Sequence, residues 1–407
     1  MSISFADRYV LAMLIQPIKA ELHLSDSQVG LVTGFAFSAF YAVFGLLIAR
    51  ISDRGWHRAV ILASLFVWSA MTSLSGFAVN FFQLLLARFG VGAGEAGVAP
   101  ASHATLAQLF TPESRSTVLA FFSAGGPLGI LTAFAVSGPL ELALGWRWTF
   151  IVMGIPGALL ALLFVCTVPA LPTSATVEKI DASSARNVGA VALLSNRTFV
   201  YLLASISLIA LLAFGIPQWL PAFFERSFNV SRATLGPHLA LTQGFGMLIG
   251  MTAGGWLADR LARRNPRWRM RLVMISVVGA VPFVMGTLVL PSYSLALTCA
   301  GFAALLLGVT GGPVWSAVQE VAPAEGRATA AALAMMVSSF LGLGLGPLLI
   351  GIASDLLVAQ NGQGSLRQAL IIVSAIGSTA LVIALRATLL RIERSASAQA
   401  VGTNVAG

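Results

Sequence analysis

The sequence predicts an all-α membrane protein with twelve transmembrane helices in two six-helix bundles. Of its 407 residues, 57% are hydrophobic and 10% are charged, whereas a soluble domain carries roughly 25% charged residues. Apolar segments long enough to cross the ~30 Å hydrocarbon core as helices, at ~20 residues each, recur along the whole chain. Strands of a membrane β-barrel would instead alternate polar and apolar residues over about ten positions, so the pattern favours helices.

Six apolar segments precede a polar stretch and six follow it. The first six lie near residues 3–20, 29–49, 59–79, 82–109, 116–143 and 148–170, and the second six near 199–223, 233–258, 272–290, 293–318, 328–355 and 367–390. The polar stretch at 171–195 predicts a cytoplasmic linker. We therefore expect an N-terminal bundle over 1–170, a C-terminal bundle over 196–395 and a flexible tail over 396–407.

The distribution of basic residues predicts the orientation in the membrane. With a cytoplasmic N-terminus, most Lys and Arg residues fall in cytoplasmic connections, and the outer connections hold Lys19, Arg147, Arg226, Arg232 and Arg367. This bias follows the positive-inside rule, so both termini should be cytoplasmic. The N-terminus lacks a basic region and a small-residue cleavage site, so no cleavable signal peptide is evident. We expect the chain in a bacterial inner membrane.

The two halves repeat each other. Ala49-Arg50-Ile51-Ser52-Asp53-Arg54 ends the second span, and Gly255-Trp256-Leu257-Ala258-Asp259-Arg260 ends the eighth. Pro112-Glu113-Ser114-Arg115 precedes the fifth span, and Pro323-Ala324-Glu325-Gly326-Arg327 precedes the eleventh. Parallel repeats of this kind, with a site near the midplane between them, support alternating access by rocking of the bundles. The repeat thus indicates carriage of a solute.

Several of these motifs carry a family resemblance. Asp53-Arg54 with Arg58, the Asp259-Arg260 echo, and Arg88 with Gly92 and Gly94 resemble the signature motifs of the major facilitator superfamily. The resemblance covers nearly the whole chain and implies the two-bundle fold of that family. It also implies a cytoplasmic latch formed by Asp53, Arg54, Arg58, Asp259 and Arg260.

Within the superfamily, three segments resemble spinster-like lysolipid and sphingolipid transporters, although organic-anion and sugar-acid symporters share much of the pattern. They are Asp7-Arg8-Tyr9, Arg88 through Gly92-Ala93-Gly94-Glu95, and Gly145-Trp146-Arg147-Trp148. The chain departs from the family at Ala49, where Gly is usual, at a transposed Gly55-Trp56, and at Gly126-Pro127-Leu128-Gly129, which matches the antiporter pattern in part. Asp7 is also only six residues from Met1, so we expect a short first span and a native start upstream.

Four charged residues fall inside predicted spans: Asp7, Arg8, Arg88 and Glu95. Ionisable groups inside a membrane are functional candidates. Arg88 and Glu95 are seven residues apart, two helical turns, and so share one helix face. We expect Glu95 near Arg8 or Arg88 and Asp7 near Arg88. The alternative is a static ion-pair network that holds the first and fourth spans together.

On the functional interpretation, Glu95 or Asp7 is the proton-coupling group. Burial favours the neutral form of a carboxylate and a nearby arginine favours the charged form, so motion between states can change its protonation. Arg8 and Arg88 are the expected substrate-binding residues, because a guanidinium suits carboxylate or phosphate. His103, eight residues after Glu95, is a further candidate with a pKa suited to proton relay, and Trp315 is the aromatic candidate in the C-terminal half.

The sequence therefore predicts a proton-coupled secondary transporter of an amphipathic or organic anion, lysolipid-like, working as a monomer in the lipid bilayer. A sugar-acid or organic-anion proton symporter is the first alternative, and a non-transporting membrane receptor or scaffold is the second. No metal-ligand cluster, G-x-S-x-G elbow or phosphate-cradling glycine loop is present, which argues against an enzyme, a cofactor or a bound metal. Basic residues in short loops, without a basic face, argue against nucleic acid.

Overall fold

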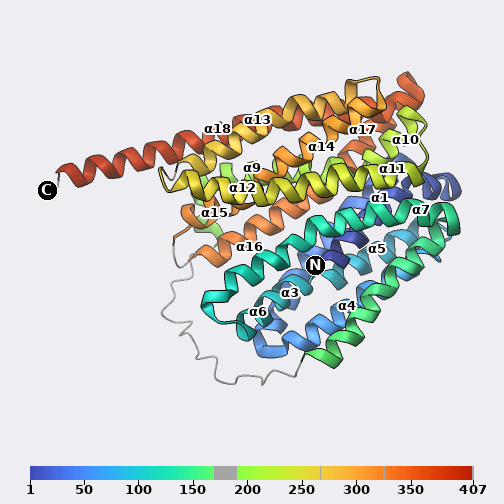
Figure 1. The fold of residues 1–407 in the computed structure, drawn as a ribbon, viewed down its shortest axis with the longest axis horizontal. Coiled ribbons are helices and arrows are strands. Elements are labelled where there is room, and N and C mark those ends of the chain that lie inside the picture. Colours follow the sequence, from blue (N-terminus) through green and yellow to red (C-terminus); the bar gives the residue numbers. More distant parts are fainter. Residues whose placement is uncertain (169–189, 266, 324–325, 406–407) are drawn as a thin grey trace. The chain divides into compact units, whose positions relative to one another are not determined.

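The computed structural model describes residues 1–168, 190–265, 267–323 and 326–405, with the backbone alone described at some positions. Throughout these ranges the chain is helical apart from short connections (Figure 1). Each apolar segment predicted to span the membrane is occupied for most of its length by one helix or by consecutive helices. Short π-helical turns interrupt several of them. The helical membrane architecture predicted from the sequence is therefore present.

The helices of the N-terminal half follow the predicted segments closely. In chain order they are α1 (Ser2–Leu22), α2 (Asp26–Gly30), η1 (Leu31–Phe35), α3 (Ala36–Ile51), η2 (Ser52–Trp56), α4 (His57–Ser75), α5 (Phe81–Glu95), α6 (Val98–Leu109) and α7 (Pro112–Thr167). Helix α7 covers two predicted spans, and Gly145 divides it with a φ of 78° that favours glycine.

The second half continues in the same way, with helices α8 (Ala190–Ser195), α9 (Arg197–Ala210), η3 (Leu211–Gly215), η4 (Ile216–Gln218), α10 (Leu220–Phe228), α11 (Arg232–Leu239), η5 (Ala240–Phe245), α12 (Gly246–Ala262), α13 (Trp268–Val289), α14 (Tyr293–Val309), α15 (Gly311–Val321), α16 (Arg327–Ser338), η7 (Ser339–Leu345), α17 (Gly346–Asn361), η8 (Gly362–Gly364) and α18 (Ser365–Val405). Residues 169–189 of the predicted linker lie outside the described residues. The linker's last six residues form α8, and α18 continues through most of the predicted tail, to Val405.

Among the described residues, eight helical stretches are long and apolar enough to cross a membrane. They include Arg54–Ser75, Phe121–Thr167 and Trp268–Val289. Helix α1 is not among them, although its 21 residues match the length of a span. Asp7 and Arg8 interrupt its apolar sequence, so α1 depends on partners for its charged side chains.

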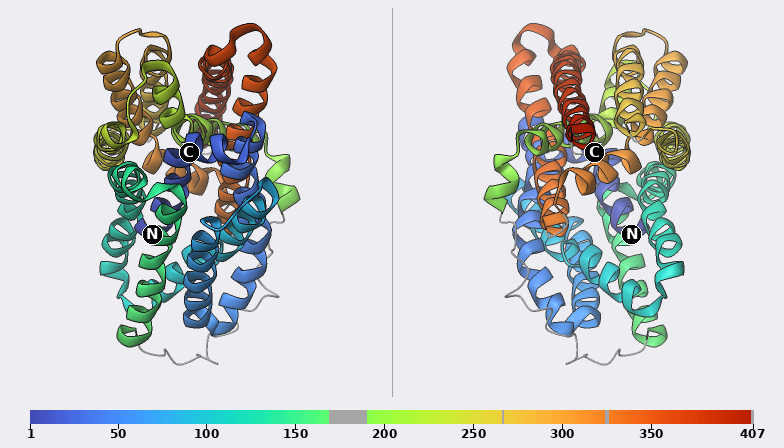
Figure 2. Two further views of the ribbon diagram at one scale, coloured as in Figure 1. Left: turned by 90° about the vertical axis from the view of Figure 1, so that its right-hand side faces the viewer. Right: turned by 90° about the vertical axis from the view of Figure 1, so that its left-hand side faces the viewer.

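The chain forms two compact units. Unit 1 comprises Met1–Glu178, Gly215–Phe245 and Leu343–Leu370, and unit 2 comprises Lys179–Phe214, Gly246–Gly342 and Ile371–Gly407. In unit 1, α1 and α4 pack against α7, and α3 and α4 pack against α5. Figure 2 shows α3 to α5 grouped as a bundle in both views. In unit 2, α12 and α13 pack against α14.

Two glycines bring α5 close to its neighbours. A Cβ at Gly92 would lie 2.4 Å from the carbonyl oxygen of Phe37 in α3, and a Cβ at Gly94 would lie 2.7 Å from the backbone nitrogen of Trp68 in α4. Glycine therefore allows backbone-to-backbone packing of the kind that membrane helices use. This packing fixes α5, and with it Arg88 and Glu95, between α3 and α4.

Candidate functional site

An ion pair joins the first helix to the end of α5. Arg8 donates from Nε to Oε2 of Glu95 over 2.7 Å, and its Nη2 lies 2.6 Å from the same oxygen. Ser4, one turn earlier in α1, donates its hydroxyl to Glu95 Oε2 over 2.8 Å. The Glu95 side chain is fully buried, and that of Arg8 is 12% exposed. Glu95 thus lies beside an arginine and away from lipid, as the sequence predicts.

A second charge pair lies one residue earlier in α1. Asp7 Oδ2 is 3.9 Å from Nη1 of Arg88 and accepts a hydrogen bond of 2.8 Å from the hydroxyl of Thr72 in α4. Asp7 and Arg88 are 2% and 1% exposed. The separation of 3.9 Å exceeds that of a charge-assisted hydrogen bond, which is about 2.7–2.9 Å. The pair is therefore loose compared with Arg8 and Glu95.

We call Asp7, Arg8, Arg88 and Glu95 the buried quartet. With all four ionised its net charge is zero. Several of its polar atoms have no hydrogen-bond partner among the described residues: Asp7 Oδ1, Glu95 Oε1, and Nε and Nη1 of Arg88. Because buried polar groups in proteins are normally hydrogen-bonded, these atoms mark capacity for a further ligand, a water or a proton.

Aromatic rings enclose the Arg8 guanidinium. Its Cζ lies 5.0 Å from the ring centre of Phe5, 4.5 Å from that of Phe37 and 5.1 Å from that of Tyr41. The same Phe37 ring lies 5.9 Å from Cζ of Arg88. Cation–π contacts of this kind stabilise a guanidinium without neutralising its charge. Phe37 therefore contacts both cations of the quartet.

Of the two arginines expected near Glu95, the structure pairs Arg8 with it. The partner of Glu95 is Arg8, and Arg88 lies beside Asp7. Seven residues on one helix span about 10 Å, too far for direct contact, so each residue of α5 meets a different neighbour on α1. The spacing of Arg88 and Glu95 predicts that they share one face of the helix, but it does not identify the partner of each residue on α1.

Two other candidates, His103 and Trp315, belong to other helices than the quartet. His103 is in α6, beyond a break at residues 96–97, and its ring packs edge-on against Phe122 with centroids 5.4 Å apart. Trp315 is half-buried in α15 of unit 2. The contacts described for these residues do not link them to Glu95.

The predicted latch residues lie at the ends of helices. Arg54 is exposed in η2, Arg58 donates from Nη2 to the carbonyl oxygen of Val165 over 2.9 Å, and the side chain of Asp53 lies outside the described residues. In unit 2, Asp259 lies 3.8 Å from Arg269, and Arg260 stacks over Trp256 at 5.3 Å. Their gating role stays a prediction.

A polar cluster that sequence reasoning missed surrounds Asp26 at the start of α2. Arg226 of α10 donates to both carboxylate oxygens, and Ser354 of α17 donates to Oδ2 over 2.7 Å. Lys19 completes the shell around Asp26, which is 1% exposed. The amides of Asp26 and Ser27 donate to Asp355 over 3.0 and 2.8 Å. Elements of both sequence halves thus meet here within unit 1.

A second cluster of the same kind involves Arg232 at the start of α11. Its guanidinium donates from Nε and Nη2 to Glu225 over 3.0 and 2.8 Å, and from Nη1 to Glu141 of α7 over 2.6 Å. All these residues fall in or beside connections predicted to face outward. The only sequence signal was a few charged residues at the predicted outer ends of the spans.

The profile of the Major Facilitator Superfamily matches residues 1–347. The chain belongs to this superfamily. It is therefore a membrane transporter and not an enzyme, and its family transports small molecules.

Relatives within the superfamily differ in what their names say they carry. The chain is 34% identical over 380 residues to an MFS-type efflux pump of Mycolicibacterium smegmatis, covering 92% of this chain and 86% of the pump. It is 26% identical over 385 residues to the sphingosine-1-phosphate transporter SPNS2 of Xenopus tropicalis, covering 89% of this chain and 74% of that transporter. It is 23% identical over 364 residues to the hexuronate transporter of Bacillus subtilis, with 87% and 85% covered.

Among solved structures, the chain is similar to a bacterial homologue of the human lysosomal transporter Spinster, in an inward-facing and unoccupied conformation. The TM-score is 0.83 and the sequence identity 24%, and the match covers 96% of this chain and 95% of the other. The fold predicted from the sequence, and its likeness to the spinster-like group, are confirmed.

Proposed function

We propose that this transporter couples the movement of an amphipathic or organic anion, of lysolipid type, to that of a proton by alternating access. The observation that carries the proposal is the buried quartet, two carboxylates and two guanidiniums held together in low-exposure surroundings. Charged groups inside a membrane are retained where they bind an ion or a substrate.

The net charge of the quartet determines whether proton binding favours or opposes anion binding. Fully ionised, the quartet is neutral and attracts an anion weakly. Protonation of one carboxylate leaves a net charge of +1, and a neutral Glu95 releases Arg8, whose fork of donors then suits a carboxylate or phosphate. Anion and proton thus favour each other's binding, which is the thermodynamic requirement for symport.

Glu95 is the proposed proton site, and Arg8 and Arg88 the proposed anion site. Glu95 Oε1 has no hydrogen-bond partner among the described residues, and neither do Nε and Nη1 of Arg88. These atoms therefore offer an acceptor for the proton and donors for the anion. In this scheme Asp7 stays hydrogen-bonded to Thr72 and beside Arg88. Its charge contributes to the electrostatic potential at the proton site and at the anion site. His103 and Trp315 are proposed only as secondary contacts.

The relatives support an anionic substrate. Sphingosine-1-phosphate is a phosphorylated amphiphile, and a hexuronate is a sugar acid, so two relatives of different specificity carry anions by their names. The aromatic rings around Arg8 favour the amphiphile, because they offer apolar surface beside the cation. A sugar acid remains the alternative substrate.

Export by proton antiport is a second candidate, because the relative at 34% identity is an efflux pump. In antiport the proton and the substrate exclude each other. That favours a cationic substrate, which would bind the carboxylates of the quartet only when they are deprotonated. The two candidates therefore differ in the sign of the substrate charge and in the direction of proton flow.

The proposed setting is a bacterial inner membrane with both termini cytoplasmic, following the basic residues of the connections. In this orientation the Asp26 and Arg232 clusters lie at the outer ends of the helices. We also propose that residues 171–195 form the linker between the two six-helix bundles.

The mechanism is tested by measuring the proton flow that accompanies substrate entry into liposomes. The purified protein is reconstituted into liposomes that hold a pH indicator, with no initial pH gradient. External lysophosphatidylglycerol or glucuronate is then added, and internal substrate is quantified after albumin washing. Symport acidifies the lumen as substrate enters, and antiport makes it alkaline. Uptake without any pH change would overturn coupling, and absence of uptake for both probes would overturn the anion assignment.

A further inference from the structure

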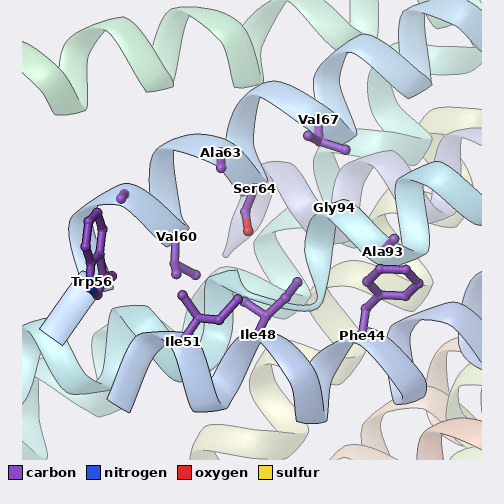
Figure 3. Close-up of a pocket in the computed structure, with 11 residues that line it drawn as sticks. Phe44, Ile48, Ile51, Trp56, Val60, Ala63, Ser64, Val67, Ala93 and Gly94 are labelled. Carbon is purple, nitrogen blue, oxygen red and sulfur yellow. The ribbon is translucent and has the colours of Figure 1, made fainter. Parts of the chain in front are cut away.

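An apolar groove lies on unit 1 between α3 and α4, with α5 as its floor (Figure 3). Its volume is about 380 Å³, within the range of small-molecule sites. Phe44 and Ile48 come from α3, Val60 and Val67 from α4, and Ala93–Gly94 from α5. Ser64 adds a hydroxyl group to this largely apolar lining. The groove therefore suits a hydrocarbon and offers little to a polar ligand.

The groove opens to the outside of unit 1. Its rim residues Ile51, Trp56 and Val67 are 46%, 62% and 38% exposed. In a membrane protein an outward apolar face of this kind meets the acyl chains of the bilayer. The groove is therefore accessible from the surface of unit 1.

One end of the groove adjoins the turn between α3 and α4. Gly55, with a φ of 90°, turns the chain between α3 and α4 and places Trp56 at one end of the groove. Arg54, exposed and two residues away, lies in the same turn. Tryptophan concentrates at the membrane interface, where lipid headgroups lie. An aromatic side chain thus lies at one end of the groove, and an exposed arginine lies in the same turn.

The groove is separate from the buried quartet. Gly94 faces α4, and a Cβ there would lie 2.7 Å from the Trp68 nitrogen, while its neighbour Glu95 faces Arg8 of α1. Adjacent helix residues point about 100° apart, so the two sites use different faces of α5. The close packing of α5 on α4 lies between them.

We infer that the groove binds one acyl chain of an anionic phospholipid of the surrounding bilayer, with the lipid phosphate beside Arg54. The chain fills the gap between α3 and α4 against the backbone of α5, and Arg54 selects the headgroup. A bilayer lipid is the occupant because the groove is apolar, opens at the surface of unit 1, and has a tryptophan of the interfacial type at one end.

A photoreactive lipid tests this inference in the full chain. The protein is reconstituted in vesicles that contain phosphatidylglycerol with a diazirine in one acyl chain, irradiated, digested and mapped by mass spectrometry. Phosphatidylcholine with the same chain is the second arm. Labelling should concentrate on the segments 44–67 and 93–94. Removing the Arg54 charge should weaken the preference for phosphatidylglycerol about fivefold.

Two matched variants decide the outcome. Ala63→Phe puts a ring into the groove at an exposed alanine and should reduce labelling of the groove to background, whereas Ala158→Phe makes the same change at an exposed alanine of α7 and should not. Groove labelling unchanged in Ala63→Phe, or no stronger than near Ala158, overturns the site. Equal labelling by both lipids overturns the headgroup assignment. Displacement of the label by the transported substrate identifies that substrate as the occupant and also overturns the proposal.

Discussion

Arg226 and Asp26, 200 residues apart, form a two-pronged ion pair, with Nη1 to Oδ2 at 2.8 Å and Nη2 to Oδ1 at 2.7 Å. Parallel hydrogen bonds of this type are the strong form of the arginine–carboxylate contact. The pair connects α2 to α10, and Ser354 adds α17. Three helical elements from both halves of the sequence are thus held by one buried carboxylate.

Replacing Asp26 by Asn should lower the stability of the protein markedly. Removal of one partner from a buried pair typically costs about 3–5 kcal/mol, because the other charge is left without compensation. Thermal unfolding in detergent measures the effect. Asp259→Asn is the control, since Asp259 is 72% exposed and lies 3.8 Å from Arg269, and exposed pairs contribute about 0–1 kcal/mol. Equal losses in both variants would contradict the structural role of Asp26.

Glu95→Gln should abolish proton-driven accumulation and leave substrate exchange measurable. Glutamine keeps the shape and hydrogen-bonding capacity of the side chain but does not titrate. Uptake by proteoliposomes under an imposed pH gradient measures proton-driven accumulation. Counterflow without a gradient measures substrate exchange. Glu21→Gln, at a carboxylate outside the quartet, should retain both. Accumulation by Glu95→Gln equal to that of the unmodified protein would favour the static ion-pair interpretation.

Arg8→Lys should weaken anion binding while proton coupling persists. Lysine preserves the charge of the quartet but loses the planar fork and the stacking on Phe37 and Tyr41. The loss of a charge-assisted hydrogen bond, about 1.5–3 kcal/mol, corresponds to roughly ten- to hundredfold in Kd. Binding isotherms and the ratio of protons to substrate are the two readouts. Arg264→Lys, at an exposed arginine, is the control, and an unchanged Kd in Arg8→Lys would remove Arg8 from the site.

Gly92→Ala should destabilise the N-terminal bundle, because the added Cβ would lie 2.4 Å from the Phe37 carbonyl oxygen. Overpacking of this kind costs about 1–3 kcal/mol. Gly45→Ala in α3 is the matched control, since a Cβ there meets nothing within 4 Å. Thermal unfolding should separate the two variants. A stable Gly92→Ala protein would show that α3 and α5 can move apart at this point.

The contribution of Glu21 to stability should depend on pH. Hydrogen bonds from Trp146 and Arg147 lower the pKa of the Glu21 carboxyl below its ordinary value. A lowered folded-state pKa stabilises the protein above the unfolded-state pKa of about 4.3, and this contribution is lost as pH falls through the folded-state value. The difference in melting temperature between the unmodified protein and Glu21→Gln should therefore be present at neutral pH and shrink in acid. A difference independent of pH would assign it to packing.

Much of this structure follows from one-dimensional patterns. Apolar segments located the helices, because the bilayer sets their length, and a charge in such a segment marked Asp7, Arg8, Arg88 and Glu95 as buried. Helical periodicity placed Arg88 and Glu95 on one face. These features depend on local sequence and on the membrane, so a single chain is enough to predict them.

The contacts that depend on three-dimensional packing were not predictable. Periodicity could not distinguish Arg8 from Arg88 as the partner of Glu95, because that choice depends on the axial position of α1 beside α5. Asp26 looked like an ordinary connection residue, since its partner Arg226 lies 200 residues away. The packing of His103 against Phe122 of α7 was likewise not predictable from its spacing to Glu95.

The neutral quartet also constrains how the protein is made. Helix α1 leaves the ribosome with Asp7 and Arg8 unpaired, and Glu95, the partner of Arg8, follows 87 residues later. An arginine or aspartate at the centre of an inserting helix costs about 2.5–3.5 kcal/mol, and α1 lacks the uninterrupted apolar run that would offset it. Helix α1 is therefore among the later helices to settle stably in the bilayer, after α5 has arrived to neutralise it.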